Sequence, residues 1–318
     1  MSTEPATTPT TGTRADGGGP GRTIAVLGAG GVGGLLAALL ARAGHRVLVL
    51  AREESAFQLV TDGITVRSGV FGDFTATVSA APVLHEPVDA VLVTVKGTAL
   101  DEALGRVPAR ALGGASVVPF LNGFEHVATL RRRYPAEQVI PGTIRVESTR
   151  VAPGEIVHDS AFADIELAGP DLARAEHLAQ LFRGAGLQAS VADDENAMLW
   201  RKLAFLAPFA ALTTRHRVSG DIVIARHRDE LNAVVREIAA VAAAAGCQTD
   251  PDATVAAVRR FAPGAKSSML RDAEAGRSLE LDSILGAVLR AAEARGIPTP
   301  RLREAIAAIV SAPDVESR

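Results

Sequence analysis

Cysteine is nearly absent from this chain of 318 residues, in which Cys247 is the only one. A single cysteine forms neither an internal disulfide nor a thiolate metal cluster, so the sequence excludes a small secreted scaffold held together by disulfides. Because nothing in it favours an oxidising compartment, we expect a cytoplasmic protein.

An excess of charge of one sign is also missing. The 33 basic and 36 acidic residues give a formal net charge of −3 and are spread along the chain, so no long-range field attracts a polyanion. We therefore expect no nucleic-acid partner. The 7 histidines have no metal-ligand spacing, and we expect no metal site.

Long hydrophobic runs are rare, and the one at residues 24–41 superficially resembles a signal peptide or a membrane span. Several glycines interrupt this run early, and a good strand follows it at residues 46–50. A buried strand, a turn and a helix explain this pattern better than a membrane segment does. We expect no membrane partner.

Large apolar side chains are lacking in the first 22 residues, which are rich in Thr, Gly and Pro. Such a segment cannot offset the entropy cost of ordering, so we predict a disordered tail over residues 1–22. The remaining length, with 47% apolar residues in the chain, is enough for two domains.

Strands and helices alternate over the first half of the chain. Residues 23–27 predict a strand, residues 32–43 a helix that ends at Gly44, and residues 46–50 the next strand, which is the pattern of a right-handed parallel crossover. The alternation predicts an α/β fold with a Rossmann-type doubly wound sheet over residues 23–192.

Later segments continue this alternation. We expect further strands at residues 90–95, 115–120 and 139–144, with helices at residues 99–106 and 125–133. Shorter strands of an antiparallel extension are expected at residues 64–67, 73–79, 155–158 and 164–167.

The second half of the chain has a different pattern. From about Asp193 onward, apolar residues recur at helical spacing and strand-like alternation disappears. This predicts an all-helical domain over residues 193–318. The expected helices lie at residues 195–213, 229–245, 251–260, 281–295 and 301–310.

The glycines of the early run form a motif. Gly28-Ala29-Gly30-Gly31-Val32-Gly33 matches G-x-G-x-x-G between an expected strand and an expected helix. The first glycine permits a tight turn, the second lets the backbone approach a pyrophosphate, and the third allows close helix packing. A glycine-rich turn without a ligand is the weaker interpretation in this context, so we predict a dinucleotide site.

Arg52 indicates which dinucleotide binds. An NAD-specific site usually has an acidic residue about twenty positions after the glycines, whereas here the strand ends Val49-Leu50-Ala51-Arg52. A guanidinium at this position can hold the 2′-phosphate of NADPH. Glu53 and Glu54 are alternative acceptors for the ribose hydroxyls, and Arg52 is alternatively an ordinary surface arginine without a ligand. Lys96, after a later strand, is expected to contact phosphate or ribose.

Two blocks in the helical half, Trp200-Arg201-Lys202-Leu203 and Ser267-Ser268-Met269-Leu270, carry further information. Together with the glycine motif, Lys96 and the Leu121-Asn122-Gly123 turn, they resemble ketopantoate reductases (2-dehydropantoate 2-reductases). The resemblance covers nearly the whole chain after the tail. It implies NADPH-dependent reduction of a small 2-oxo acid to a 2-hydroxy acid, as in pantothenate biosynthesis.

The resemblance also implies roles for single residues. Lys202 would be the general acid that protonates the carbonyl oxygen as hydride arrives, and Glu280 would hold the resulting hydroxyl. Asn122 would position nicotinamide and substrate, and Ser268 would contact the substrate carboxylate. Chemistry agrees for the lysine, because a lysine partly desolvated in a cleft has its pKa lowered toward the operating pH.

Each of these residues also has an ordinary interpretation. Lys202 is alternatively a surface lysine on a helix, and Glu280 a partner of Arg277. Ser267 or Ser268 is alternatively a helix cap. The joint match of several ordered motifs favours the site.

The chain departs from the family pattern at three positions. Family members usually have asparagines four and eight residues after the lysine, on the same helix face, where this chain has Leu206 and Ala210. Leu285 replaces a third asparagine. A 2-oxo acid with an apolar side chain is therefore an alternative substrate, and a catalytically silent NADP-binding sensor is an alternative of another class. The oligomeric state is left open, a homodimer included.

Overall fold

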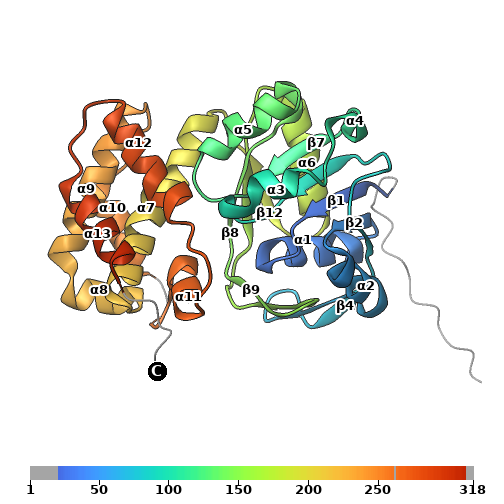
Figure 1. Cartoon of the computed structure of the whole chain (residues 1–318), viewed down its shortest axis with the longest axis horizontal. Coiled ribbons are helices and arrows are strands. Elements are labelled where there is room, and N and C mark those ends of the chain that lie inside the picture. Colours follow the sequence, from blue (N-terminus) through green and yellow to red (C-terminus); the bar gives the residue numbers. More distant parts are fainter. Residues whose placement is uncertain (1–20, 261–262, 313–318) are drawn as a thin grey trace, which may run out of the picture.

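A computed structural model describes residues 21–260 and 263–312 (Figure 1). The predicted tail lies outside the described residues up to residue 20. The C-terminal helices form one side of the molecule and the sheets form the other, as Figure 1 shows.

A parallel sheet of five strands lies at the centre of the N-terminal half, as predicted. Its order is β5-β2-β1-β6-β7, and every neighbouring pair is parallel. The strands are β1 (Thr23–Leu27), β2 (Arg46–Leu50), β5 (Ser79–Ala81), β6 (Ala90–Val93) and β7 (Ser116–Pro119).

Both faces of this sheet are covered. Ile24 and Val26 of β1 belong to one core cluster, whereas Ala25 and Leu27 belong to another on the opposite face. Because successive side chains of a strand point to opposite faces, a strand buried on both faces has the nearly continuous apolar sequence seen here.

Helices and two small sheets cover the faces. The helices of this half are α1 (Gly31–Arg42), α2 (Glu53–Asp62), α3 (Leu100–Leu104), α4 (Ala109–Leu112), α5 (Glu125–Arg133) and α6 (Leu172–Gly184), with short 3-10 turns η1 (Gly97–Ala99) and η2 (Ala136–Gln138). Helices α2 and α6 are not among the sequence predictions.

The small sheets correct two predictions. One has the order β4 (Phe74–Ala76), β3 (Ile64–Ser68), β10 (Glu155–His158), β9 (Ser148–Ala152), and the other the order β12 (Gln188–Val191), β11 (Asp164–Leu167), β8 (Gly142–Arg145). The expected antiparallel extension is only partly right, because β10 pairs parallel with β3 and β11 pairs parallel with β12.

The expected strand at residues 139–144 is also different. Only Val139 bridges to Val117 of the central sheet, whereas β8 begins at Gly142 and pairs antiparallel with β11. After this bridge the chain leaves the central sheet and joins the smaller one.

The described residues from Glu195 onward contain helices and no strand, as predicted. The helices are α7 (Glu195–His216), α8 (Gly220–Arg226), α9 (Arg228–Ala244), α10 (Pro251–Arg259), α11 (Ser268–Glu274), the π-helix η3 (Asp282–Gly286), α12 (Ala287–Glu293) and α13 (Pro300–Val310). They surround a core of their own, and α7 packs against both α9 and α13.

Helix α7 joins the two cores. Met198 and Leu199 pack in the core beneath the parallel sheet, whereas Trp200 and Leu203 pack in the helical core. Lys202 therefore lies where the two halves meet. No helix in the described part of the chain is long and apolar enough to cross a membrane.

Gly33 in α1 offers a test of how this fold is packed. A Cβ at Gly33 would lie 2.0 Å from the Gly28 carbonyl oxygen and 2.2 Å from Thr94 Oγ1, so one of them must shift. We expect Gly33→Ala to lower the free energy of unfolding by roughly 1–3 kcal/mol, measured by urea denaturation.

Gly30→Ala is the matched control for this test. A Cβ there meets nothing within 4 Å, and Gly30 has a φ of −77° that alanine also adopts. The control should therefore unfold at nearly the same urea concentration as the unchanged chain. Equal losses in the two variants would show that close packing at Gly33 is not the cause.

Candidate active site

The glycine motif forms the turn between β1 and α1. Gly28 has a φ of +102°, a left-handed conformation that side chains disfavour, and Gly33 packs closely on the turn. Gly30 caps the N-terminus of α1, where no side chain accepts from the first amides and no acidic residue is in the first turn. Open space over Gly30 and unpaired amides suit an approaching pyrophosphate.

The other motif positions continue this cradle. Ala29 and Val32 pack against the core beneath α1, and the Gly31 carbonyl accepts from the Ser148 hydroxyl at 2.8 Å. A Cβ at Gly31 would lie 2.1 Å from the Ser148 carbonyl oxygen, so the extra glycine of the motif lets β9 approach the turn.

The carboxyl ends of three neighbouring strands meet at this place. Gly28 follows β1, Lys96 follows β6 and Asn122 follows β7. Strands β1 and β6 are adjacent although β2 pairs on the other side of β1, so the chain reverses its direction across the sheet here. Ligands of open α/β sheets bind in the crevice at such a point.

Arg52 lies at the end of β2, outside this group. Its side chain is 79% exposed, and its nearest carboxylate, Glu102, is 3.9 Å away, so little competes for the guanidinium. The strand ends at Leu50, and Glu53 and Glu54 lie in the first turn of α2.

Lys96 has a protein partner that the sequence does not predict. Its Nζ lies 2.7 Å from Oδ2 of Asp272, a nearly buried residue of α11. Asp272 also accepts from Nε of Arg277 at 2.9 Å. The interpretation of Glu280 as a partner of Arg277 is therefore wrong, because Asp272 takes that role. The Lys96–Asp272 pair bridges the two halves of the chain.

Glu280 forms a second bridge. Its Oε1 accepts from the backbone N–H of Gly97 at 3.0 Å, and its Oε2 accepts from Nδ2 of Asn122 at 3.0 Å. The side chain is only 7% exposed, so these bonds replace water around a buried carboxylate. Glu280 thus connects the segment before η3 to the ends of β6 and β7.

Glycines permit this close approach. A Cβ at Gly97 would lie 3.0 Å from Ser283 Cβ, and one at Gly123 would lie 2.1 Å from the Ser283 carbonyl oxygen. Gly123 also has a φ of +82°. Gly97 is not among the residues predicted from the sequence, although it directly follows Lys96 near the carboxyl end of a strand, where ligands of such sheets bind.

Lys202 is partly buried on α7 and interacts electrostatically with Glu280. Burial lowers the pKa of Lys202 to about 8, because desolvation disfavours the ammonium, and the Glu280 charge opposes this effect. A lysine with such a pKa is mostly protonated at neutral pH and gives up its proton more readily than an exposed lysine.

The remaining candidates lie nearby on the helical half. Ser267 is the N-cap of α11, since its hydroxyl accepts from the Leu270 N–H at 3.0 Å, and Ser268 begins this helix with an exposed side chain. Leu206 is partly buried at the edge of the helical core. Ala210 has no exposed surface and packs inside that core, so in this conformation it offers no contact to a ligand.

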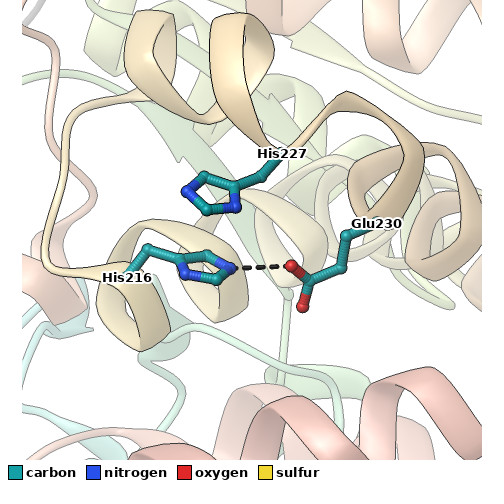
Figure 2. A group of neighbouring side chains, drawn as sticks. All are labelled: His216, His227 and Glu230. Atoms are coloured by element: carbon teal, nitrogen blue, oxygen red, sulfur yellow. Dashed lines mark hydrogen bonds and ion pairs between the residues drawn. The ribbon is translucent and has the colours of Figure 1, made fainter.

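A histidine cluster lies at the α7–α9 contact (Figure 2). His216, His227 and Glu230 have potential metal-ligand atoms within 4.8 Å of one another, which their spacing in the sequence does not reveal. However, the two imidazole rings stack with their centroids 3.6 Å apart and 13° between their planes, so their nitrogen lone pairs lie in nearly parallel planes. Both Glu230 oxygens have partners, His216 Nε2 at 2.7 Å and Arg215 Nη1 at 2.6 Å. This geometry favours an ion-pair network.

Comparisons with known proteins agree with this geometry. A family model described as ketopantoate reductase PanE/ApbA matches residues 24–169, and the C-terminal model of the same family matches residues 194–312. A 2-dehydropantoate 2-reductase of Caulobacter vibrioides is 31% identical over 282 residues, which are 87% of this chain and 94% of the relative.

Two solved structures have a similar fold. The 2-dehydropantoate 2-reductase of Geobacter metallireducens GS-15 has a TM-score of 0.83 at 29% identity, covering 92% of this chain and all of that one (100%). A D-mandelate dehydrogenase in ternary complex with NADH and anilino(oxo)acetate has a TM-score of 0.83 at 22% identity, covering 91% and 97%, and shares the fold.

The match covers both halves of the chain and includes the strand ends and the helix that carry the site. The chain belongs to the ketopantoate reductase family, whose members are NAD(P)-dependent oxidoreductases.

Proposed function

We propose that this enzyme reduces the keto group of a small 2-oxo acid to a hydroxyl, with NADPH as the reductant and ketopantoate as the first candidate substrate. The observation that carries the proposal is the Glu280 carboxylate. It accepts hydrogen bonds from the ends of two strands and interacts with Lys202, so it gathers the polar groups that carbonyl reduction needs.

The two halves divide the work in this proposal. Residues 23–192 bind the cofactor, and residues 193–318 supply the general acid and most of the substrate pocket. We assign the reaction to the cytoplasm because the chain holds a single cysteine.

The cofactor cradle is the turn from Gly28 to Gly33. Its amides and the open space over Gly30 fit a pyrophosphate, and the exposed Arg52 guanidinium fits a 2′-phosphate. When bound, the reduced nicotinamide supplies the hydride. Lys96 contributes less to phosphate binding than Arg52 does, because Asp272 already holds its ammonium.

Lys202 acts as the general acid. Negative charge develops on the carbonyl oxygen during reduction, and a nearby ammonium stabilises this charge and then donates its proton. Glu280 keeps the ammonium oriented, and its oxygens retain lone pairs that accept from the product hydroxyl. Asn122, held by Glu280 at the end of β7, positions the reacting groups.

Leu206 supports a second candidate substrate. Its apolar side chain lies one helical turn from Lys202, on the face where family members have an asparagine. A 2-oxo acid with a branched aliphatic or aryl side chain fits such a surface better than the hydroxylated side chain of ketopantoate does. A silent sensor is less well supported, because it needs neither Lys202 nor Glu280.

The first prediction concerns the cofactor. Arg52→Ala should weaken NADPH binding by about ten- to a hundredfold, the value of a lost charge-assisted hydrogen bond to phosphate, and change NADH binding little. Dissociation constants from fluorescence titration test this. Glu53→Gln should leave both affinities unchanged. Preference of the unchanged enzyme for NADH, or a loss of NADH affinity in Glu53→Gln, would assign the ribose contact to the acid instead.

The second prediction concerns proton transfer. Lys202→Ala should lower kcat by roughly a hundred- to ten-thousandfold while NADPH affinity stays the same. Arg201→Ala is the matched control, because Arg201 is the neighbouring cation on α7 and pairs with Glu166 at 2.8 Å. Near-normal turnover of Lys202→Ala on the best substrate found would show that another group is the acid.

The third prediction concerns the substrate. Leu206→Asn should shift the kcat/KM ratio toward ketopantoate and away from 2-ketoisovalerate and phenylpyruvate by about five- to tenfold, the value of one hydrogen bond. Leu206→Ala, which removes apolar area without adding an amide, should weaken the apolar substrates only. An unchanged enzyme that prefers ketopantoate by several orders of magnitude would contradict the apolar-pocket idea.

A further inference from the structure

His126 is a buried side chain without a hydrogen-bond partner. It is 7% exposed, and neither Nδ1 nor Nε2 is bonded to any described residue. A neutral imidazole carries one N–H donor and one lone pair, so both of its polar groups are buried unpaired. Because such groups cost free energy, one that persists in a native fold calls for an explanation such as a catalytic role.

Contacts between α5 and α7 place His126 near the active site. Arg131 Nη2 of α5 lies 2.6 Å from Oε2 of Glu195, and the Phe124 ring lies 5.1 Å from the Trp200 ring, so the two helices run antiparallel. His126 lies between these two contacts along α5. It is therefore level with Met198 and Leu199, one turn before Lys202, and a helical side chain at Lys202 leans back toward that turn.

Burial first and the Lys202 charge second lower the pKa of His126 to about 3. The ring is therefore neutral over the pH range in which enzymes work, and one of its nitrogens always offers a lone pair. Two titratable groups interact electrostatically with Lys202: Glu280, which lies just before η3, and His126, which lies on α5. The charged groups near His126 on α5 have ion-pair partners of their own: Glu125 pairs with Arg290, which also pairs with Asp282, and Arg131 pairs with Glu195.

Lys202 needs acceptors of this kind. Its ammonium has three N–H groups, and no hydrogen bond joins it to another described residue. In catalysis one N–H points at the substrate carbonyl and one at Glu280, which leaves a third. A second carboxylate beside it would hold the proton too tightly for donation, whereas a neutral acceptor orients the ammonium without adding charge.

We propose that His126 is a positioning residue for Lys202: its neutral ring accepts one N–H of the ammonium when substrate is bound and so aims another at the substrate carbonyl. The proposal rests on the proposed function of Lys202 as the general acid. The flexible four-carbon stem of lysine lets its ammonium change direction without movement of its helix.

Two variants test this proposal. His126→Phe keeps the aromatic volume and removes both nitrogens, and His126→Gln keeps an acceptor. For His126→Phe we expect kcat to fall by about ten- to a hundredfold, with KM and the NADPH dissociation constant within about twofold of the unchanged enzyme. The alkaline limb of the kcat–pH profile should move to lower pH, because the charged form of Lys202 loses an acceptor. His126→Gln should restore most of kcat and the position of the limb.

Other outcomes would overturn the proposal. An unchanged kcat and alkaline limb in His126→Phe would show that the ring only fills space, and so would equal losses of kcat in both variants together with a lower melting temperature. A fall in kcat with an unmoved limb would show that His126 does not act through Lys202. Failure of the proposed function is seen separately, as normal turnover of Lys202→Ala.

Discussion

The site depends on the hydrogen bonds that the buried Glu280 carboxylate accepts. A carboxylate removed from water is stable only when donors replace the lost hydration. Those donors are the backbone of Gly97 and the side chain of Asn122, which come from the ends of neighbouring strands. The same bonds that stabilise the charge therefore dock the segment before η3 onto the sheet, and the Lys96–Asp272 pair reinforces the docking at the next position.

The electrostatics of Lys202 follow from this arrangement. The lysine is desolvated because α7 is held against the sheet, and its charge is balanced by Glu280 because Glu280 is held there as well. Removing the docking would expose the lysine to water and separate it from its counter-ion at once. Fold stability and acid strength are thus set by the same contacts.

Much of the fold follows from local sequence patterns. The apolar runs of β1, β2, β6 and β7 predict strands because both of their faces are buried, and the glycine motif predicts the turn before α1. Helix α2 escapes prediction because Phe57 is 77% exposed and only Ala56 and Leu59 are buried, so its apolar residues do not mark its buried face. Helix α6 could have been predicted, since its buried residues have helical spacing: Ala175, Leu178, Ala179 and Phe182.

The site, like the fold, can be predicted from the sequence only in part. The glycine motif, Lys96, Asn122 and Lys202 can be found because motifs mark them. The hydrogen bonds between these residues cannot, because Gly97 and Glu280 are 183 residues apart and no local pattern joins them. The same holds for Asp272 with Lys96, and for Ala210, whose burial depends on how α7 packs among the other helices.

The place of α7 in two cores also has a consequence for the chain as it is made. Val127 and Leu130 share one core cluster with Met198 and Leu199, which are translated much later. Until α7 has been synthesised, the part of the chain that has emerged from the ribosome therefore exposes some of its apolar surface, a state that is prone to aggregate. The first turns of α7 contribute to this core, so the helix that carries Lys202 also completes the packing of the N-terminal half.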